Sequence, residues 1–164
     1  MHGVRGERVT AAHLVPCSGQ RDVDDARALL AASDLTLSGL GEAGVHLWLA
    51  RDDGGAVVAT TGYEASEDGR DVLVRSVAVT PGLRGRGMGL GLASWALERA
   101  VEAGAARAWL FSRRSGPFWE RAGFTPGDRD EMARRLASTH QVRQFVATGQ
   151  LGREVAWTRR LSGA

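Results

Sequence analysis

The first half of the chain carries short apolar runs separated by turn-forming residues, a pattern that is typical of antiparallel strands. Apolar runs at residues 45–50 and 56–63 flank an Asp-Asp-Gly-Gly turn at residues 52–55, which predicts a β-hairpin. A further turn signal at residues 67–70 leads into the apolar run 72–79, so we expect a third strand beside the hairpin. The other elements predicted in this half are a strand at residues 11–16 and a helix at residues 22–32.

The second half of the chain shows a helical period followed by the pattern of a buried strand. Apolar residues from 88 to 103 recur on one stripe of a helix that Gly104 ends, and residues 106–111 form an apolar run. A strand, a crossover helix and a second strand make a right-handed unit, so residues 72–79 and 107–111 are expected to be parallel neighbours. The fold class that follows is α/β. The remaining predicted elements are a short helix at 118–122, a strand at Phe124, helices at 130–136 and 139–148, and a strand at 153–158.

Length and charge indicate one domain and limit the kinds of partner. The chain has 164 residues, 43% of them hydrophobic, so we expect one domain over residues 1–164 with residues 1–8 as a flexible extension. Its 21 basic residues, all arginine, face 19 acidic ones, and a net charge of +2 does not indicate a nucleic-acid partner. Neither a signal-peptide pattern nor an apolar run of membrane length occurs, so a cytoplasmic protein without a membrane partner is expected.

Two further expectations concern metals and self-association. Cys17 is the only cysteine, and the sequence contains no paired-cysteine metal motif, so no metal site is expected. The predicted strand 153–158, which contains Trp157, is a candidate sheet edge. Such an edge pairs with a second copy of the chain, so a homodimer is a candidate assembly.

The most informative segment is the glycine-rich basic turn between the strand 72–79 and the helix after it. Glycines let the backbone approach an anion, and the unpaired N–H groups and dipole of the following helix favour negative charge. Arg84 and Arg86 add positive charge, so the turn is suited to hold a phosphate. A dinucleotide fingerprint fails because leucine occupies positions 90 and 92, where a third glycine is needed. A Walker P-loop fails because the chain contains no lysine.

Two segments resemble motifs of the GCN5-related N-acetyltransferase (GNAT) family. The first is Arg84-x-x-Gly87-x-Gly89, similar to the loop that surrounds the diphosphate of acetyl-coenzyme A in that family. The second is Phe118-Trp119-Glu120-Arg121-Ala122-Gly123-Phe124, similar to the family's Phe-Tyr-x-x-x-Gly-Phe segment. The resemblance covers roughly residues 10 to 126. It implies acetyl-CoA as the acetyl-donating cosubstrate, and a mixed, mostly antiparallel sheet with flanking helices and a central parallel strand pair that splays to admit it.

The same resemblance implies where the cosubstrate binds. The backbone of the third strand is expected to hydrogen-bond the pantetheine arm, and the glycine turn is expected to hold the diphosphate. The cofactor-binding residues implied are Val77, Ala78, Val79, Arg84, Gly85, Arg86, Gly87, Met88, Gly89, Leu90, Ser115, Phe118 and Trp119.

Arg75 is the candidate for substrate recognition. Strand alternation predicts that the odd-numbered residues from 73 to 79 share one face, where Arg75 interrupts an apolar stripe. A buried arginine needs a carboxylate, which is either Glu64 in a structural ion pair or a carboxylate of the substrate, and both can hold. Ser76 and His140 complete the predicted substrate site.

Acetyl transfer from a thioester to an amine needs a neutral amine, donors for a developing oxyanion and a proton for the leaving thiolate. Glu64 is the first candidate for the general base, directly or through water, with His46 and His140 as alternatives. The usual acid of the family is a tyrosine in the short helix, where this chain has Trp119. Because the tryptophan N–H is not a useful acid, the candidate proton donors are Ser112, Ser115 and water.

The function expected is acetyl-CoA-dependent N-acetylation of a small amine. Residues 62–64, 73–79 and 127–130 resemble the arsenic-resistance group of the family, which is related to amino-acid N-acetyltransferases. Together with Arg75, they favour an amino acid or a similar compound that attacks directly in a ternary complex. The alternatives are a carboxylate-free amine such as an aminoglycoside or polyamine, which acidic side chains at 64–68 would suit, and a non-catalytic acyl-CoA-binding sensor, which the missing tyrosine favours.

Overall fold

Among the described residues, 13–161, the computed structural model contains a seven-stranded sheet in the order β1-β2-β3-β4-β5-β7-β6. Neighbouring strands are antiparallel except β4 and β5, which are parallel. The strands are β1 (Val15–Pro16), β2 (Val45–Arg51), β3 (Val57–Ala65), β4 (Asp71–Val79), β5 (Arg107–Phe111), β6 (Thr125–Pro126) and β7 (Ala156–Arg160). The helices are α1 (Gly19–Ala32), α2 (Met88–Glu102), α3 (Gly116–Arg121), α4 (Arg129–Arg135) and α5 (His140–Thr148), with 3₁₀ turns at Pro81–Leu83 and Gln150–Arg153.

The main elements lie where the hydrophobic pattern predicts them. The hairpin β2–β3 pairs Leu47 with Gly62, and the crossover helix α2 brings β5 beside β4 in parallel, with Leu73 opposite Trp109. The predicted α/β class with a mixed sheet is therefore confirmed. Of the predicted first strand, only Val15–Pro16 is a strand, while residues 11–12 and the predicted extension at 1–8 lie outside the described residues.

The prediction that the last strand lies at an edge of the sheet is wrong. β7 begins at Ala156 rather than at residue 153, because a 3₁₀ turn occupies Gln150–Arg153. The strand then pairs with β5 along its whole length, from Phe111 opposite Ala156 to Arg107 opposite Arg160, and its other side pairs with β6. Pairing of a second copy along a free edge of β7 is thus not available as a route to a homodimer.

A β-bulge interrupts β4 at Ser76. Gly62 of β3 pairs with Arg75, whereas Thr60 pairs with Ala78, so β4 holds one more residue than β3 between these two pairs. Ser76 has a φ of 62°, in the left-handed region that non-glycine residues rarely occupy. A serine in this conformation is strained. Strained residues cluster at functional sites, so the bulge is a candidate part of such a site.

The bulge overturns the prediction that the odd-numbered residues from 73 to 79 share one face. Leu73 packs with α4 and α5, while Val77 and Val79 pack against residues of α2 on the opposite face. An extra residue shifts the two-residue alternation by one, so Arg75 faces the side of α5 rather than the side of Val77. Arg75 therefore lies among polar contacts and not in an apolar stripe.

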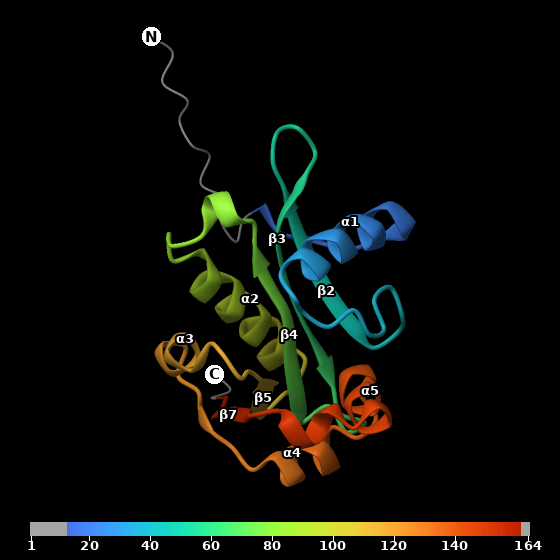
Figure 1. Ribbon diagram of the computed structural model, residues 1–164, viewed down its shortest axis with the longest axis vertical. Helices are drawn as coiled ribbons and strands as arrows, with labels where there is room; N and C mark the ends of the chain where they lie inside the picture. The colour runs from blue at the N-terminus through green and yellow to red at the C-terminus, as the bar shows by residue number, and fades with distance from the viewer. Residues whose placement is uncertain (1–12, 162–164) are drawn as a thin grey trace.

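Helices cover both faces of the sheet (Figure 1). On one face, Leu97 of α2 and Trp119 of α3 share a core with Val74 and Leu110 of the sheet. On the other face, α1 packs on β2, and α4 and α5 pack on the ends of β4, β5 and β7. No helix in residues 13–161 is long and apolar enough to cross a membrane.

The central parallel strands separate after a short region of pairing. β4 and β5 align only from Asp71 opposite Arg107 to Leu73 opposite Trp109. Beyond these residues the two strands no longer pair, and this confirms the expected splay of the central pair. The opening faces the first turn of α2.

Candidate functional site

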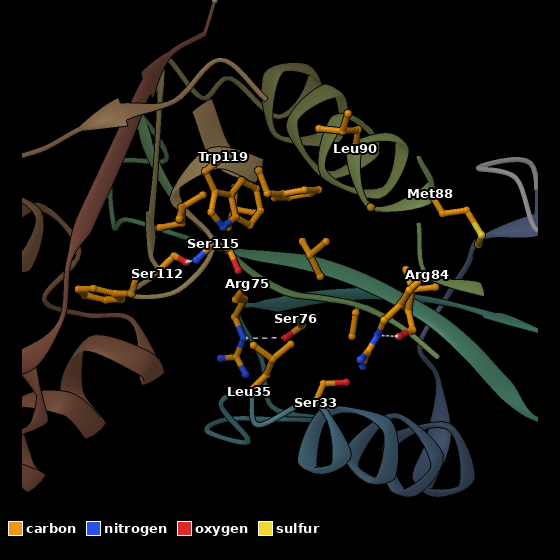
Figure 2. Close-up of a pocket in the computed structure, with 18 of the residues that line it drawn as sticks. Ser33, Leu35, Arg75, Ser76, Arg84, Met88, Leu90, Ser112, Ser115 and Trp119 are labelled. Carbon is orange, nitrogen blue, oxygen red and sulfur yellow. Dashed lines mark hydrogen bonds between the residues drawn. The ribbon is translucent and has the colours of Figure 1, made fainter. Parts of the chain in front are cut away.

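The separation of β4 from β5 opens a cleft of about 690 Å³, a size typical of small-molecule sites. Residues 74–79 of β4 and 110–112 at the end of β5 line it, together with the first turn of α2, with α3 and with the segment that follows α1. Figure 2 shows Arg84 and Ser112 at opposite ends of this cleft, and Leu90 of α2 across from Ser33.

One end of the cleft has the features of an anion site. Gly85 and Gly87 have φ values of 79° and 76°, and a Cβ added at either would meet no atom within 4 Å, so the turn leaves open space above its backbone. Gly87 precedes α2 without a side-chain cap, so the first N–H groups of the helix keep their capacity to bind a ligand. Arg84 Nε donates to the Val79 carbonyl at 3.0 Å, which holds this arginine beside the turn. The donors and the positive charge fit a diphosphate.

The bulge of β4 forms the middle of the cleft wall. Ser76 and Val77 both line the cleft, and Thr60 Oγ1 donates to the Ser76 carbonyl at 2.7 Å. A bulge leaves its extra residue outside the regular pairing of the ladder, so a backbone N–H at this point is a candidate donor to a ligand in the cleft. Such a group can stabilise negative charge that develops on an oxygen in the cleft.

The other end of the cleft combines an aromatic wall with two hydroxyl groups. Trp119 is buried, and its ring meets Phe118 and Phe124 edge to face at 4.7 and 5.5 Å between centroids. Ser112 Oγ accepts the backbone N–H of Ser115 at 3.1 Å. This bond does not use the hydroxyl hydrogen of Ser112, which can therefore be donated to a ligand.

A buried ion pair adjoins the cleft. Arg75 Nη1 lies 3.0 Å from Glu64 Oε2, and the two side chains are only 0% and 3% exposed. Burial lowers the pKa of the Arg75 guanidinium, and the charge and hydrogen bond of Glu64 oppose this change. The predicted ion pair between Arg75 and Glu64 is therefore confirmed.

Glu64 also caps α5 from a distant part of the chain. Its Oε1 accepts the His140 N–H at 2.6 Å, and its Oε2 accepts the Gln141 N–H at 3.2 Å. Within α5, the Thr139 hydroxyl oxygen accepts the Val142 N–H at 3.4 Å. A carboxylate at a helix N-terminus is stabilised by the free N–H groups and by the dipole. One side chain thus joins β3, β4 and α5.

Three buried polar atoms in the cleft wall lack a hydrogen-bond partner within residues 13–161: Ser33 Oγ, Arg75 Nη2 and Gln141 Oε1. Arg75 Nε donates to Ser76 Oγ at 3.2 Å, so the guanidinium lies beside the bulge, as Figure 2 shows. Buried donors and acceptors are almost always paired, because leaving one unpaired costs about 1–3 kcal/mol. The three atoms are therefore candidates to bind a polar ligand.

Most of the predicted site residues lie in the cleft wall. Those that line it are Arg75, Ser76, Val77, Ala78, Val79, Arg84, Gly85, Gly87, Met88, Gly89, Leu90, Ser112, Ser115, Phe118 and Trp119. Arg86, Glu64 and His140 are not among the lining residues. The His140 ring nitrogen Nε2 lies 3.4 Å from the Ala43 carbonyl and 4.0 Å from a Glu42 carboxylate oxygen, so this ring contacts the loop before β2. The predicted roles in binding and catalysis stay predictions.

Sequence reasoning missed part of the cleft wall. Leu35 and Thr36 follow α1, and Gln141 lies in α5, which reaches the cleft through a contact 77 residues away in sequence, with Glu64. No local pattern signals such a contact. Arg121, by contrast, lies inside a recognised motif and faces the cleft, so the motif itself could have indicated it.

The sequence matches one family model over most of its length. The model, described as the acetyltransferase (GNAT) family, matches residues 14–124, which include the glycine turn, α2 and α3. A search of curated proteins found no significant match.

Solved structures share the fold at low sequence identity. N-acetylglutamate synthase from Neisseria gonorrhoeae, complexed with coenzyme A and N-acetyl-glutamate, is 17% identical with a TM-score of 0.69, over 91% of this chain and only 35% of the synthase. Rv2747 from Mycobacterium tuberculosis, in complex with CoA and NLQ, is 18% identical with a TM-score of 0.64, over 91% and 99% of the two chains. Tetrahymena GCN5 is 10% identical with a TM-score of 0.71, over 92% and 97%.

Proposed function

Because the chain belongs to the acetyltransferase (GNAT) family and is an acyltransferase whose acetyl donor is acetyl-CoA, we propose that it acetylates the amine of a small molecule that carries a carboxylate. The observation that carries this proposal is the unpartnered Nη2 of Arg75 in the cleft wall. Guanidinium groups bind carboxylates through short, charge-assisted hydrogen bonds. Since Glu64 uses Nη1, the second nitrogen is left for the substrate.

The neighbouring structures support an amino acid as the acceptor. The synthase from Neisseria gonorrhoeae was solved with N-acetyl-glutamate, an acetylated amino acid, together with coenzyme A. An amino acid carries the amine that would be acetylated and the carboxylate that Arg75 would bind. We therefore assign this chain an amino acid or an amino-acid-like compound as its substrate.

Residues at different positions along the cleft have different roles in this proposal. Acetyl-CoA, when bound, supplies an acetyl group activated as a thioester. Arg84 and the N-terminus of α2 hold the diphosphate, and the backbone N–H at the bulge stabilises negative charge on the reacting carbonyl oxygen. Ser112 donates its hydroxyl hydrogen into the cleft, and Trp119 excludes water beside it.

Glu64 has a positioning role in this proposal. Its two carboxylate oxygens are engaged by Arg75 and by the N–H groups of His140 and Gln141, and it does not line the cleft. A general base must come within hydrogen-bond reach of the amine or of one bridging water. Glu64 instead holds the Arg75 guanidinium in place, and the amine enters in its neutral form.

The amine attacks directly, without an acyl-enzyme. Cys17 is the one cysteine of the sequence, and it is not among the residues that line the cleft. Burial raises the pKa of the Cys17 thiol, and the nearby Asp22 carboxylate adds to this effect. Since the thiolate is the nucleophilic form, such a cysteine is poorly suited to accept an acetyl group.

Acetyl-CoA-dependent thiol release tests the proposal with matched acceptors. Amino acids and their amides differ at the carboxylate, so turnover expressed per neutral amine should favour the acids. The Arg75→Met variant should lower kcat/KM for the acids about 10- to 100-fold, because it removes a hydrogen bond to a charged group. It should leave the amides and acetyl-CoA binding little changed, and Arg27→Met, at an exposed position of α1, should behave like the parent protein. Turnover of only carboxylate-free amines, or none despite acetyl-CoA binding, would overturn the proposal.

A further inference from the structure

We propose that Gln141 accepts a hydrogen bond from the attacking amine, and that Gln141 and Arg75 together make the site selective for α-amines. This inference rests on the proposed function, because it takes the carboxylate-bearing acceptor bound by Arg75 as its starting point. It adds a specificity-determining residue on α5 and a position for the amine relative to the carboxylate.

The Gln141 side chain is placed to meet a ligand. It is 8% exposed, its Oε1 has no hydrogen-bond partner within residues 13–161, and it lines the cleft. Its backbone N–H is fixed at 3.2 Å from Glu64 Oε2, so the start of its side chain has a defined position. An amide oxygen buried without a donor is unfavourable, and an N–H group of a bound substrate removes that cost.

Arg75 and Gln141 are held by the same atom. Arg75 Nη1 lies 3.0 Å from Glu64 Oε2, the oxygen that also accepts the Gln141 N–H. One carboxylate oxygen therefore holds Arg75 and the backbone of Gln141 together, and both residues carry an unpartnered polar atom in the cleft wall, Nη2 and Oε1. A ligand that satisfies both must carry an acceptor and an N–H on the same small fragment, and an α-amino acid does so.

The position of the guanidinium limits the distance between the carboxylate and the reacting nitrogen. Arg75 Nε donates to Ser76 Oγ at 3.2 Å, which keeps the guanidinium next to the bulge in Figure 2. The bulge carries the backbone donor assigned to the reacting carbonyl oxygen. A carboxylate on Arg75 therefore lies close to the point of reaction, and an amine on the adjacent carbon reaches that point. An amine at the end of a longer chain must fold back or pass beyond it.

The role of Gln141 is to orient the amine. The nitrogen bonds to the acetyl carbon with its lone pair as the carbon–sulfur bond breaks with its electrons on sulfur, and the nitrogen then releases one proton to water. An N–H directed at Gln141 Oε1 leaves the lone pair free to point away from α5 and towards the cleft. Gln141 thus aligns the nucleophile and takes no proton.

Positional isomers test the selectivity. L-2-aminobutyrate and 4-aminobutyrate have the same composition but carry the amine on different carbons. Nε-acetyl-lysine, with a free α-amine, and Nα-acetyl-lysine, with a free ε-amine, form a larger pair, and both keep the lysine carboxylate. When kcat/KM is expressed per concentration of neutral amine, the compound with the free α-amine in each pair should have a kcat/KM at least about tenfold higher than its isomer. A tenfold ratio corresponds to the contribution of about one hydrogen bond. Equal rates, or a preference for the distant amine in either pair, would overturn the proposal.

The Gln141→Leu variant tests the role of Gln141 in orienting the amine. It should lower kcat/KM for L-2-aminobutyrate about tenfold and reduce the preference over 4-aminobutyrate. Its thermal midpoint should stay equal or rise, because the change removes a buried unpaired oxygen at similar volume, and this separates positioning from a structural role. Acetyl-CoA binding should not change, and Gln20→Leu, at an exposed position of α1, should match the parent protein.

The outcomes separate this inference from the proposed function. If Arg75→Met impairs amino-acid turnover while Gln141→Leu changes neither the rate nor the isomer preference, the proposed function stands and the role of Gln141 fails. If no carboxylate-bearing amine is acetylated although acetyl-CoA binds, the proposed function fails as well. A Gln141→Leu protein with a lowered thermal midpoint and an unchanged isomer preference would show a structural role instead.

Discussion

At the scale of single residues, the ion pair between Glu64 and Arg75 is asymmetric. Arg75 has one carboxylate partner, whereas Glu64 also accepts the N–H groups of His140 and Gln141. Losing Glu64 therefore leaves a buried cation and two helix N–H groups without partners. Losing Arg75 leaves a carboxylate that keeps two donors at a helix N-terminus. The contribution of the pair to stability thus depends on which partner is removed.

This asymmetry predicts unequal effects of removing each partner. Glu64→Leu should lower the free energy of unfolding by about 3–5 kcal/mol, the usual result of leaving a buried charge unpaired. Arg75→Met should cost clearly less, and the double variant should be more stable than Glu64→Leu alone because the uncompensated cation is gone. Urea denaturation of the three variants and the parent protein measures these differences. Equal losses for the two single variants would contradict the assignment of Glu64 as the shared partner.

At the scale of elements, α4 and α5, which pack on the sheet behind the cleft, begin with side-chain caps that fix their ends. Thr139 and the distant Glu64 cap α5, and Asp128 caps α4 by accepting the Glu131 N–H at 2.9 Å. The pKa of the Asp128 carboxyl is lowered, first by this hydrogen bond. Met132 of α4 is fully buried against β4 and β5, so the position of this helix matters for the sheet behind the cleft.

The cap on α4 predicts a pH-dependent contribution to stability. Because the carboxyl has a lower pKa in the folded protein than in the unfolded chain, its stabilising effect is present above the unfolded value of about 3.9 and is lost as the pH falls through the folded value. Asp128→Asn keeps a capping oxygen but does not titrate. The stability difference between the parent protein and this variant, from urea midpoints, should therefore shrink between about pH 5 and pH 3. A difference that stays constant over this range would contradict the role of the carboxylate.

The elements could be predicted from the sequence because each depends on local patterns. The hairpin follows from an Asp-Asp-Gly-Gly turn between apolar runs, and α2 follows from one apolar stripe. The bulge at Ser76 could not be predicted, because it depends on how β3 aligns with β4, and a single extra residue reversed the predicted faces. The link from Glu64 to α5 and the place of Gln141 also depend on the folding of distant segments. The anion end of the site was therefore predictable, whereas at the acceptor end only Arg75, Ser76 and the pairing of Arg75 with Glu64 were.

At the scale of the whole molecule, the cleft lies between two parts of one sheet. Only the aligned residues from Asp71 to Leu73 join β4 to β5, and beyond them residues of both strands line the cleft together with residues of α2 and α3. A ligand that fills the cleft contacts both parts. Ligand binding should therefore affect the amides along the cleft more than those of distant turns.

Hydrogen exchange with and without acetyl-CoA tests this expectation. At about 100 times its dissociation constant, the ligand should raise the free energy of unfolding by about 2.7 kcal/mol through mass action alone. Beyond this global effect, exchange should slow most at residues 85–90, where the N–H groups of the glycine turn and of the uncapped α2 lie, and at residues 112–115. The hairpin tip at residues 52–55 opens locally and lies outside the cleft wall, so its exchange should not change. Equal slowing at the hairpin tip and at the glycine turn would contradict binding in this cleft, because a ligand that protects a local opening must contact the residues that open.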